Sequence, residues 1–270
     1  MLPTRYWQDL PWTAFPALPK DTVAVLPVAA IEQHGPHLPV SVDRTINEGV
    51  LARTLALLPD ALPLLVLPVQ AIGLSVEHIR FPGTLTASAE TLIALWTEVG
   101  QSVARAGVRK LVLLNSHGGQ PQVVDIVCRR LRATSGMFAV ACMWSRLGMP
   151  DGLVSPIEAR HGIHGGFVET SLMLHLAPER VDMAKADDFR SRWIAHENDF
   201  SVLVPEGAVG FGWETQDLNP AGALGDASAA TAEAGAQILD HAAALLATLL
   251  QEVHRLDLDE WLQAVPRSDG

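Results

Sequence analysis

The sequence is poor in cysteine, and the two thiols that it does carry show no functional spacing. Among 270 residues there are only Cys128 and Cys142. One lies in a helix-like pattern and the other in a strand-like run. Such isolated, apolar surroundings fit a reducing compartment better than a disulfide framework. Without Cys-x-x-Cys spacing, thiol catalysis is not expected.

Clusters of positive charge and long apolar runs are also missing. The formal net charge is −11 and no Lys/Arg-rich run occurs, so we expect neither nucleic acid nor an anionic membrane as a partner. The N-terminus lacks a basic region followed by an apolar run, and the apolar runs near 22–31 and 63–72 are too short to span a bilayer. The sequence therefore predicts a cytoplasmic protein.

Several catalytic and nucleotide-binding motifs are absent as well. No Gly-x-Ser-x-Gly elbow, Walker loop or Gly-x-Gly-x-x-Gly after a strand occurs. These absences argue against a serine hydrolase of the elbow type and against a phosphate-binding nucleotide domain.

The composition that remains, 49% hydrophobic and 18% charged, is typical of one compact domain over residues 1–270. Short apolar runs that are typical of strands buried on both faces occur at 22–31, 64–72, 109–115 and 137–144. Apolar stripes that are typical of amphipathic helices occur at 89–106, 121–133 and 226–254. Strands that alternate with helices predict an α/β fold with a mostly parallel sheet covered on both faces. The segment 183–222 is irregular, and we expect it to form a lid or a subunit contact.

Polar residues follow the first predicted strand. Glu32 and His34 lie two positions apart, so at an extended strand end they would point the same way, and Asp43 follows after a short loop. In open α/β sheets, ligands bind beyond the carboxyl ends of the strands. Two carboxylates and an imidazole are suitable ligands for Zn²⁺, Mn²⁺ or Fe²⁺. This pattern predicts a metal site.

Two further clusters occupy equivalent positions. His117 follows the third predicted strand, and Gly118 and Gly119 after it allow the backbone to approach a ligand closely. Glu169 lies on the apolar face of a predicted helix that begins after His164. Because an unpaired buried carboxylate is costly, we expect a cation, such as a metal ion, to face Glu169.

Each of these residues also has an ordinary structural explanation when it is taken alone. A single histidine at a strand end is more often a hydrogen-bonded structural group, and Glu32 or Glu169 could pair locally. The metal hypothesis depends on the clusters coinciding at one sheet edge. A structural role is preferred for the other histidines, namely His37, His78, His161, His175, His196, His241 and His254. The stretch from Gly73 to Thr84 is expected to supply substrate contacts.

Taken together, these motifs resemble the creatininase (creatinine amidohydrolase) family. The resemblance rests on Glu-Gln-His-Gly-Pro-His-Leu-Pro at 32–39 with Asp43, Ser75 with Glu-His at 77–78, Phe-Pro-Gly-Thr at 81–84, Asn-Ser-His-Gly-Gly at 115–119, and His-Gly-Gly at 164–166 with Glu-Thr-Ser at 169–171. These motifs stand in the family's order across about 140 residues. The resemblance implies a three-layer α/β/α sandwich, two divalent metal ions per subunit and a homo-oligomer, typically a hexamer.

The resemblance also implies individual roles. Glu32, Asp43 and His117 would bind one metal, and His34 would bind the other together with a bridging Asp43. Ser75 and His164 match substrate-binding positions, and His164 matches the proton-transfer histidine. Gly118 is a further predicted substrate contact.

One departure from the family pattern concerns Gly118 and Gly119. In creatininase itself these positions are Tyr-Glu, and that glutamate binds the second metal. Glu169 is therefore the predicted replacement as a ligand and as part of the catalytic site. The change also argues against creatinine as the natural substrate.

The predicted function is metal-dependent hydrolysis of a C–N amide bond of a small molecule, of the cyclic amide or formamide type, by a metal-activated water. His164 would protonate the leaving nitrogen. A peptidase that trims a short peptide in cofactor maturation, or a non-catalytic metal-binding assembly protein, remains an alternative.

Overall fold

A parallel sheet of four strands forms the centre of the fold. In this computed structural model, which describes residues 2–207 and 209–262, the strands are β1 (Val23–Val28), β2 (Leu64–Val66), β3 (Lys110–Asn115) and β4 (Phe138–Met143). Their order is β2-β1-β3-β4. Val25 of β1 lies opposite Val66 on one side and Val112 on the other. The four predicted strand runs are thus the four strands of the sheet.

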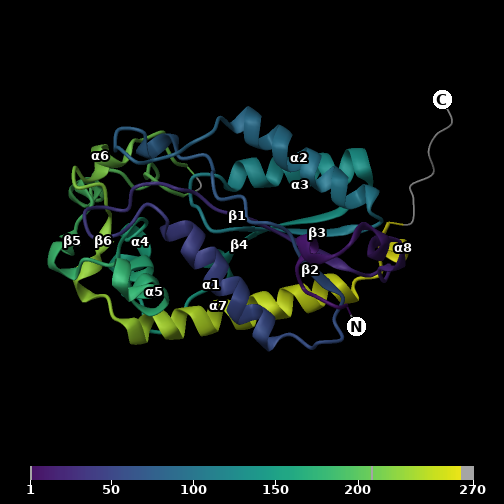
Figure 1. Cartoon of the computed structure of the whole chain (residues 1–270). Coiled ribbons are helices and arrows are strands. Elements are labelled where there is room, and N and C mark those ends of the chain that lie inside the picture. The colour runs from purple at the N-terminus through teal and green to yellow at the C-terminus, as the bar shows by residue number, and fades with distance from the viewer. Residues whose placement is uncertain (1, 208, 263–270) are drawn as a thin grey trace, which may run out of the picture.

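Helices cover both faces of this sheet. Figure 1 shows α2 (Ala89–Arg105) and α3 (Pro121–Ser135) on one face, and α1 (Val42–Leu57) and α7 (Ala232–Arg255) on the other. The helix α5 (Phe167–Leu176) packs beside α7 and α1. This arrangement is the predicted three-layer α/β/α fold.

Alternate residues of each strand enter different cores. Val23 and Val25 pack with α1 and α7, whereas Ala24 and Leu26 pack against α2 and α3. Side chains alternate across a strand, so a strand with both faces covered is apolar along most of its length. This is why the strands appear in the sequence as uninterrupted apolar runs.

Local signals set the ends of the long helices. Ser88 accepts a hydrogen bond from the Thr91 amide at the start of α2, and Gly136 ends α3 with a positive φ of 64°. The helix α7 begins at Ala232 after its cap Thr231, and not at residue 226 as predicted. Residues 225–229 instead form a short strand and a 3-10 turn, since the Asp226 amide donates to the Glu158 carboxylate.

The remaining elements are short. They are the helices α4 (Pro156–His161), α6 (Thr215–Leu218) and α8 (Leu258–Trp261), the antiparallel strands β5 (Asp188–Phe189) and β6 (Gly225–Asp226), and the 3-10 segments η1 (Trp7–Asp9), η2 (Trp12–Ala17), η3 (Val76–His78), η4 (Trp144–Leu147), η5 (Pro178–Arg180), η6 (Met183–Lys185), η7 (Arg192–His196) and η8 (Ala227–Ala229). The segment 183–222 therefore consists of loops with brief elements, as its composition predicts.

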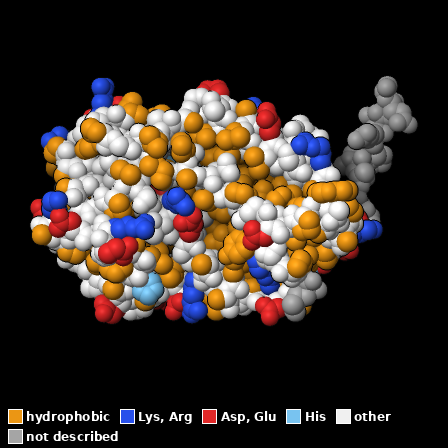
Figure 2. Space-filling view, in the orientation of Figure 1, with side chains coloured by type: hydrophobic (Ala, Val, Ile, Leu, Met, Phe, Trp, Pro, Cys, Tyr) orange, Lys and Arg blue, Asp and Glu red, His pale blue; other side chains and the backbone are white. Residues whose placement is uncertain are grey.

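Basic side chains are scattered on the face shown in Figure 2. Within 2–207 and 209–262, no helix has both the length and the apolar character that a membrane crossing requires.

Candidate metal centre

The five predicted ligand side chains meet beyond the carboxyl ends of β1 and β3. His117 Nδ1 lies 3.1 Å from Glu32 Oε1 and 3.3 Å from Asp43 Oδ2. His34 Nε2 lies 3.6 Å from Asp43 Oδ1 and 3.7 Å from Glu169 Oε2. Two groups of three ligand atoms result, Glu32–Asp43–His117 and His34–Asp43–Glu169, each with all its atoms within 4.8 Å. They share Asp43.

The side chains reach this point from different elements. β1 ends at Val28, so Glu32 and His34 lie on the loop after the strand and not on its extended end as predicted. Asp43 lies in the first turn of α1, and Glu169 in the first turn of α5. The Glu169 carboxylate accepts a 2.6 Å hydrogen bond from the Gly165 amide and reaches the cluster, with Oε2 3.7 Å from His34 Nε2.

The buried side-chain amides of Asn47 and Asn115 fix the segments that carry Asp43 and His117. The Asn47 side chain donates to the backbone carbonyls of Leu114 (2.9 Å) and Val28 (3.1 Å), which ties α1 to the ends of β3 and β1. The Asn115 side chain accepts from the His117 amide at 3.0 Å and donates to the His117 carbonyl at 2.8 Å. Asn47 lies one helical turn after Asp43, and Asn115 lies two residues before His117. These two buried amides therefore hold both ligands in place.

Backbone acceptors determine which nitrogen of each ligand ring is free. His34 Nδ1 lies 3.0 Å from the Glu32 carbonyl, and His117 Nε2 lies 2.7 Å from the Leu74 carbonyl. A carbonyl only accepts hydrogen bonds, so each of these nitrogens carries the proton. Once each ring loses its second proton, as metal ligation requires, the lone pairs of His34 Nε2 and His117 Nδ1 would therefore face the carboxylates.

The donor set fits divalent metal ions. Among the described residues, Glu32 Oε1 and Oε2, His34 Nε2 and Asp43 Oδ2 are buried without a hydrogen-bond partner. Buried polar atoms are costly when they remain unpaired, and three adjacent carboxylates add mutual repulsion. Cations between these oxygen and nitrogen atoms would remove both penalties, and the mixture of carboxylates and imidazoles suits Zn²⁺, Mn²⁺ or Fe²⁺.

Without a bound metal ion, some of the carboxylates and imidazoles in this cluster must be protonated. Burial raises the pKa of Glu32 to about 7. Burial lowers the pKa of His34, but Glu169, Asp43 and Glu32 outweigh it and bring that pKa to about 9. Burial also raises the pKa of Asp43, but hydrogen bonds from His117 and His34 dominate and leave it below its usual value. Burial lowers the pKa of His117, but Glu32 and Asp43 outweigh it and raise that pKa well above its usual value. Bound cations would displace the protons on Glu32, His34 and His117.

Two further imidazoles lie against the cluster. The rings of His34, His164 and His78 stack in series, with centroids 4.2 and 4.1 Å apart. His164 Nε2 lies 2.7 Å from the Gln33 carbonyl and carries the proton, so its Nδ1 lone pair faces Glu32 at 3.8 Å. Burial keeps the pKa of His164 well below its usual value, which leaves the ring neutral.

His78 was expected to have a purely structural role, yet it belongs to this cluster. Its Nε2 lies 3.4 Å from Glu32 Oε1, and burial lowers its pKa to about 3. Residues 32 and 78 are distant in the sequence, so no periodicity brings them together. The only signal was the resemblance of the Glu77–His78 pair to a family motif.

Glu77 accounts for glycine at position 119. Its Oε1 lies 3.3 Å from His117 Nε2, on the side of the ring away from the ligand cluster. A Cβ atom on Gly119 would overlap this oxygen. A side chain at position 119 and this position of Glu77 are therefore incompatible, which gives the departure from the Tyr-Glu pattern a structural reason.

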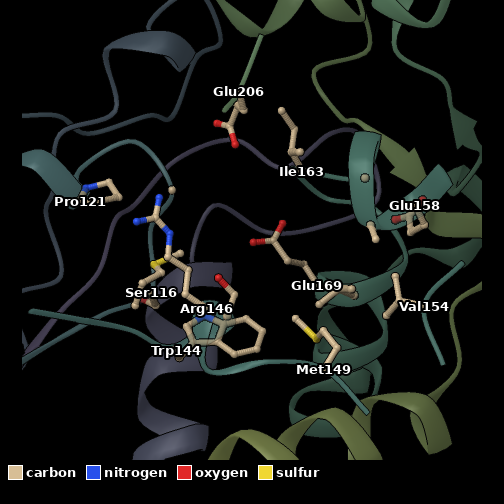
Figure 3. Close-up of a pocket in the computed structure, with 16 residues that line it drawn as sticks. Ser116, Pro121, Trp144, Arg146, Met149, Val154, Glu158, Ile163, Glu169 and Glu206 are labelled. Atoms are coloured by element: carbon tan, nitrogen blue, oxygen red, sulfur yellow. The ribbon is translucent and has the colours of Figure 1, made fainter. Parts of the chain in front are cut away.

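A cavity of about 320 Å³ opens beside the cluster (Figure 3). Its lining includes Gly118, Glu169, Trp144, Arg146 and Glu206. Trp144 is almost fully buried and forms part of the wall, whereas the Arg146 side chain points into the space (Figure 3). Two predicted substrate contacts are not part of the lining. Ser75 is fully buried, with an unpaired Oγ, and His164 is buried with its ring stacked on that of His34.

The fold and this cluster define a class, an α/β/α protein with a buried carboxylate–imidazole metal centre at the end of a parallel sheet. Comparison with known proteins assigns it further. The creatininase family model, described as creatinine amidohydrolase, matches residues 8–250. The chain belongs to the creatininase family, and it is a metal-dependent amidohydrolase that acts on C–N bonds.

Relatives within the family carry two kinds of name. The mycofactocin precursor peptide peptidase of Mycobacterium tuberculosis is 35% identical over 254 residues, which cover 91% of this chain and 87% of that protein. The creatinine amidohydrolase of Pseudomonas putida is 31% identical over 203 residues, with 67% and 75% coverage. A creatininase structure with manganese aligns with a TM-score of 0.74 at 25% identity, over 94% of this chain and all of that one. A mutant creatininase of Zn–Zn type aligns equally well at 26% identity.

Proposed function

We propose that the cluster binds two divalent metal ions, one held by Glu32, Asp43 and His117 and the other by His34, Asp43 and Glu169. The observation that carries the proposal is the shared Asp43, whose two oxygens face different imidazoles at 3.3 and 3.6 Å. A carboxylate that bridges two ions is the usual device for holding them close enough to act on one bond.

Bound divalent ions would supply a water molecule with a lowered pKa and would polarise the carbonyl of an amide. The residues of the chain move the proton. His164 Nδ1 carries a lone pair that faces the cluster, so it accepts the proton of the attacking water. It then returns that proton to the leaving nitrogen, which makes His164 the general acid. Glu169 closes the ligand set on the cavity side and fixes where the amide enters.

The substrate proposed first is a small molecule with a cyclic amide or formamide group. A short peptide is the second candidate, and two observations favour it. The cavity is lined by Arg146 and Glu206, neither of which has an ion-pair or hydrogen-bond partner within 2–207 and 209–262. Relatives that are 32–35% identical are named mycofactocin precursor peptide peptidase. A peptide carries the carboxylate and ammonium groups that these side chains would bind.

Hydrolysis assays with the metal-loaded protein test this function and separate the two candidates. Creatinine, N-formyl compounds and short peptides are offered with and without a chelator, and release of amine is measured. Chelator-sensitive release from any of them supports the amidohydrolase, and the preferred group identifies the substrate class. Metal-loaded protein that releases amine from none of them would contradict the substrate classes proposed.

We further propose a cytoplasmic homo-oligomer in which segment 183–222 forms a subunit contact or a lid. Exposed apolar side chains on this segment support the proposal, with Val202 66% and Val209 51% exposed. Apolar side chains that cluster on a surface are typical of protein contacts.

A further inference from the structure

The side-chain amide of Gln33 lies buried among four polar partners, and its orientation is determined. Gln33 Oε1 accepts from the Gly35 amide at 2.9 Å, and Gln33 Nε2 donates to the Gly222 carbonyl at 2.7 Å. A backbone N–H only donates and a carbonyl only accepts. Reversing the amide would therefore set donor against donor at Gly35 and acceptor against acceptor at Gly222.

The second N–H of the same Nε2 faces His78. Gln33 Nε2 lies 2.8 Å from His78 Nδ1, so Nδ1 must accept and must carry the ring's lone pair. The Thr215 hydroxyl is compatible with this, since it lies 2.7 Å from the same nitrogen and 3.1 Å from the Glu77 carbonyl and can donate to either. The single proton of the neutral His78 ring is thereby placed on Nε2.

That proton decides what His78 can do in the site. Nε2 faces Glu32 Oε1 at 3.4 Å and Glu77 Oε1 at 3.9 Å. Glu32, Glu77 and His78 are near enough to one another to hold a metal ion. A protonated nitrogen has no lone pair for an ion, however, so His78 presents an N–H to the two carboxylates instead.

We propose that Gln33 is a positioning residue that selects the ring tautomer of His78. It keeps the His78 lone pair out of the metal centre and directs an N–H at the carboxylate of Glu32. The effect on metal affinity rests on the proposed function, because it requires Glu32 to be a ligand. The tautomer itself does not, since it is a property of the metal-free protein.

The direct test is the nitrogen NMR spectrum of the metal-free full chain, labelled with ¹⁵N in histidine. The His78 signals are assigned by their loss in His78→Gln. We expect Nε2 protonated and Nδ1 unprotonated in the wild type. In Gln33→Glu the carboxylate accepts a hydrogen bond, so Nδ1 gains a proton. A wild-type ring protonated at Nδ1, or a Gln33→Glu spectrum equal to wild type, would overturn the proposal.

A double-mutant cycle on zinc affinity adds a second readout, measured by competition with a chromophoric chelator. Substitution of residues that orient metal ligands costs about 10–100-fold in affinity, and we expect a loss of this size for Gln33→Glu. In a His78→Gln background, where no ring remains to orient, the same change should cost under about threefold, since its partner is gone. An equal loss in both backgrounds would place the effect of Gln33 elsewhere. Normal tautomers in a protein that binds no zinc would instead refute the metal centre and leave the role of Gln33 standing.

Discussion

At the residue scale, every imidazole of the site has its proton placed by a protein acceptor or donor. The backbone carbonyls of Glu32, Leu74 and Gln33 accept hydrogen bonds from the ring N–H groups of His34, His117 and His164, respectively. The second nitrogen of each ring, His34 Nε2, His117 Nδ1 and His164 Nδ1, consequently faces the carboxylate cluster. Preorganised ligand orientation of this kind lowers the entropic cost of binding a metal ion.

Replacing His164 should separate chemistry from metal binding. In His164→Gln, metal content should remain as in the wild type, because this ring is not among the five proposed ligands. The turnover number on an amide substrate should fall about 10²–10⁴-fold, the usual contribution of general acid–base catalysis. Elemental analysis and steady-state kinetics measure the two quantities. Unchanged turnover would refute the proton-transfer role.

Metal affinity should rise with pH. The pKa of His34 is about 9 and that of Glu32 about 7, so His34 holds a proton at neutral pH in the metal-free protein. An ion must displace that proton, and each displaced proton changes the apparent affinity about tenfold per pH unit. We expect the zinc dissociation constant to fall between pH 7 and 9. Titration calorimetry in buffers of different ionisation enthalpy counts the released protons, and affinity independent of pH would contradict this account.

At the element scale, loops at the carboxyl ends of β1 and β3, together with the first turns of α1 and α5, build the centre. The sequence was sufficient to predict the four strands and their covering helices, because burial on two faces leaves continuous apolar runs and burial on one face leaves stripes. It was also sufficient to predict five side chains that the structure brings together. Their common feature, polar residues directly after strands or at a helix start, is visible in the sequence.

The features that the sequence did not predict depend on contacts between distant segments. Gln33 with His78, and Glu77 with Gly119, are pairs that no local pattern reveals. The start of α7 was misplaced because alanine-rich composition suits a helix, whereas the hydrogen bond between Asp226 and Glu158 holds residues 225–229 in another conformation. Tertiary contacts commonly override helix propensity in this way.

The two neighbouring glycines after β3 offer a matched test at this scale. A Cβ on Gly119 would overlap Glu77 Oε1 and also His117 Nε2, whereas a Cβ on Gly118 would meet no atom within 4 Å. Gly119→Ala should displace Glu77 and the His117 ring and lower zinc affinity about tenfold, the low end for changes that disturb the support of a metal ligand. Gly118→Ala should leave affinity unchanged. Equal affinities of the two variants would show that the packing at position 119 does not hold His117 in its ligand orientation.

At the scale of the whole molecule, exposed apolar side chains on segment 183–222 predict assembly. Light scattering after size exclusion should give a mass that is a multiple of 29.0 kDa. Val202→Glu, which places a charge on this surface, should reduce that mass if the segment forms a subunit contact. A monomer in the wild type would contradict the proposed homo-oligomer.

The overall architecture explains why the cluster exists at all. Four parallel strands direct their carboxyl ends to one edge, so loops from distant parts of the sequence converge there. A core on each face of the sheet fixes this edge, and the charged cluster lies outside both cores. The stability of the two cores is what allows a buried group of like charges to persist.

The measurement that tests the central claim most directly is metal stoichiometry, by elemental analysis of protein dialysed against a small excess of Zn²⁺ or Mn²⁺. The account predicts two equivalents in the wild type. It predicts a loss of both in Asp43→Ala, because both proposed sites share this carboxylate, and the loss of one in Glu169→Gln. A wild-type protein that retains no metal, or an Asp43→Ala variant that still holds two ions, would contradict the two-metal centre.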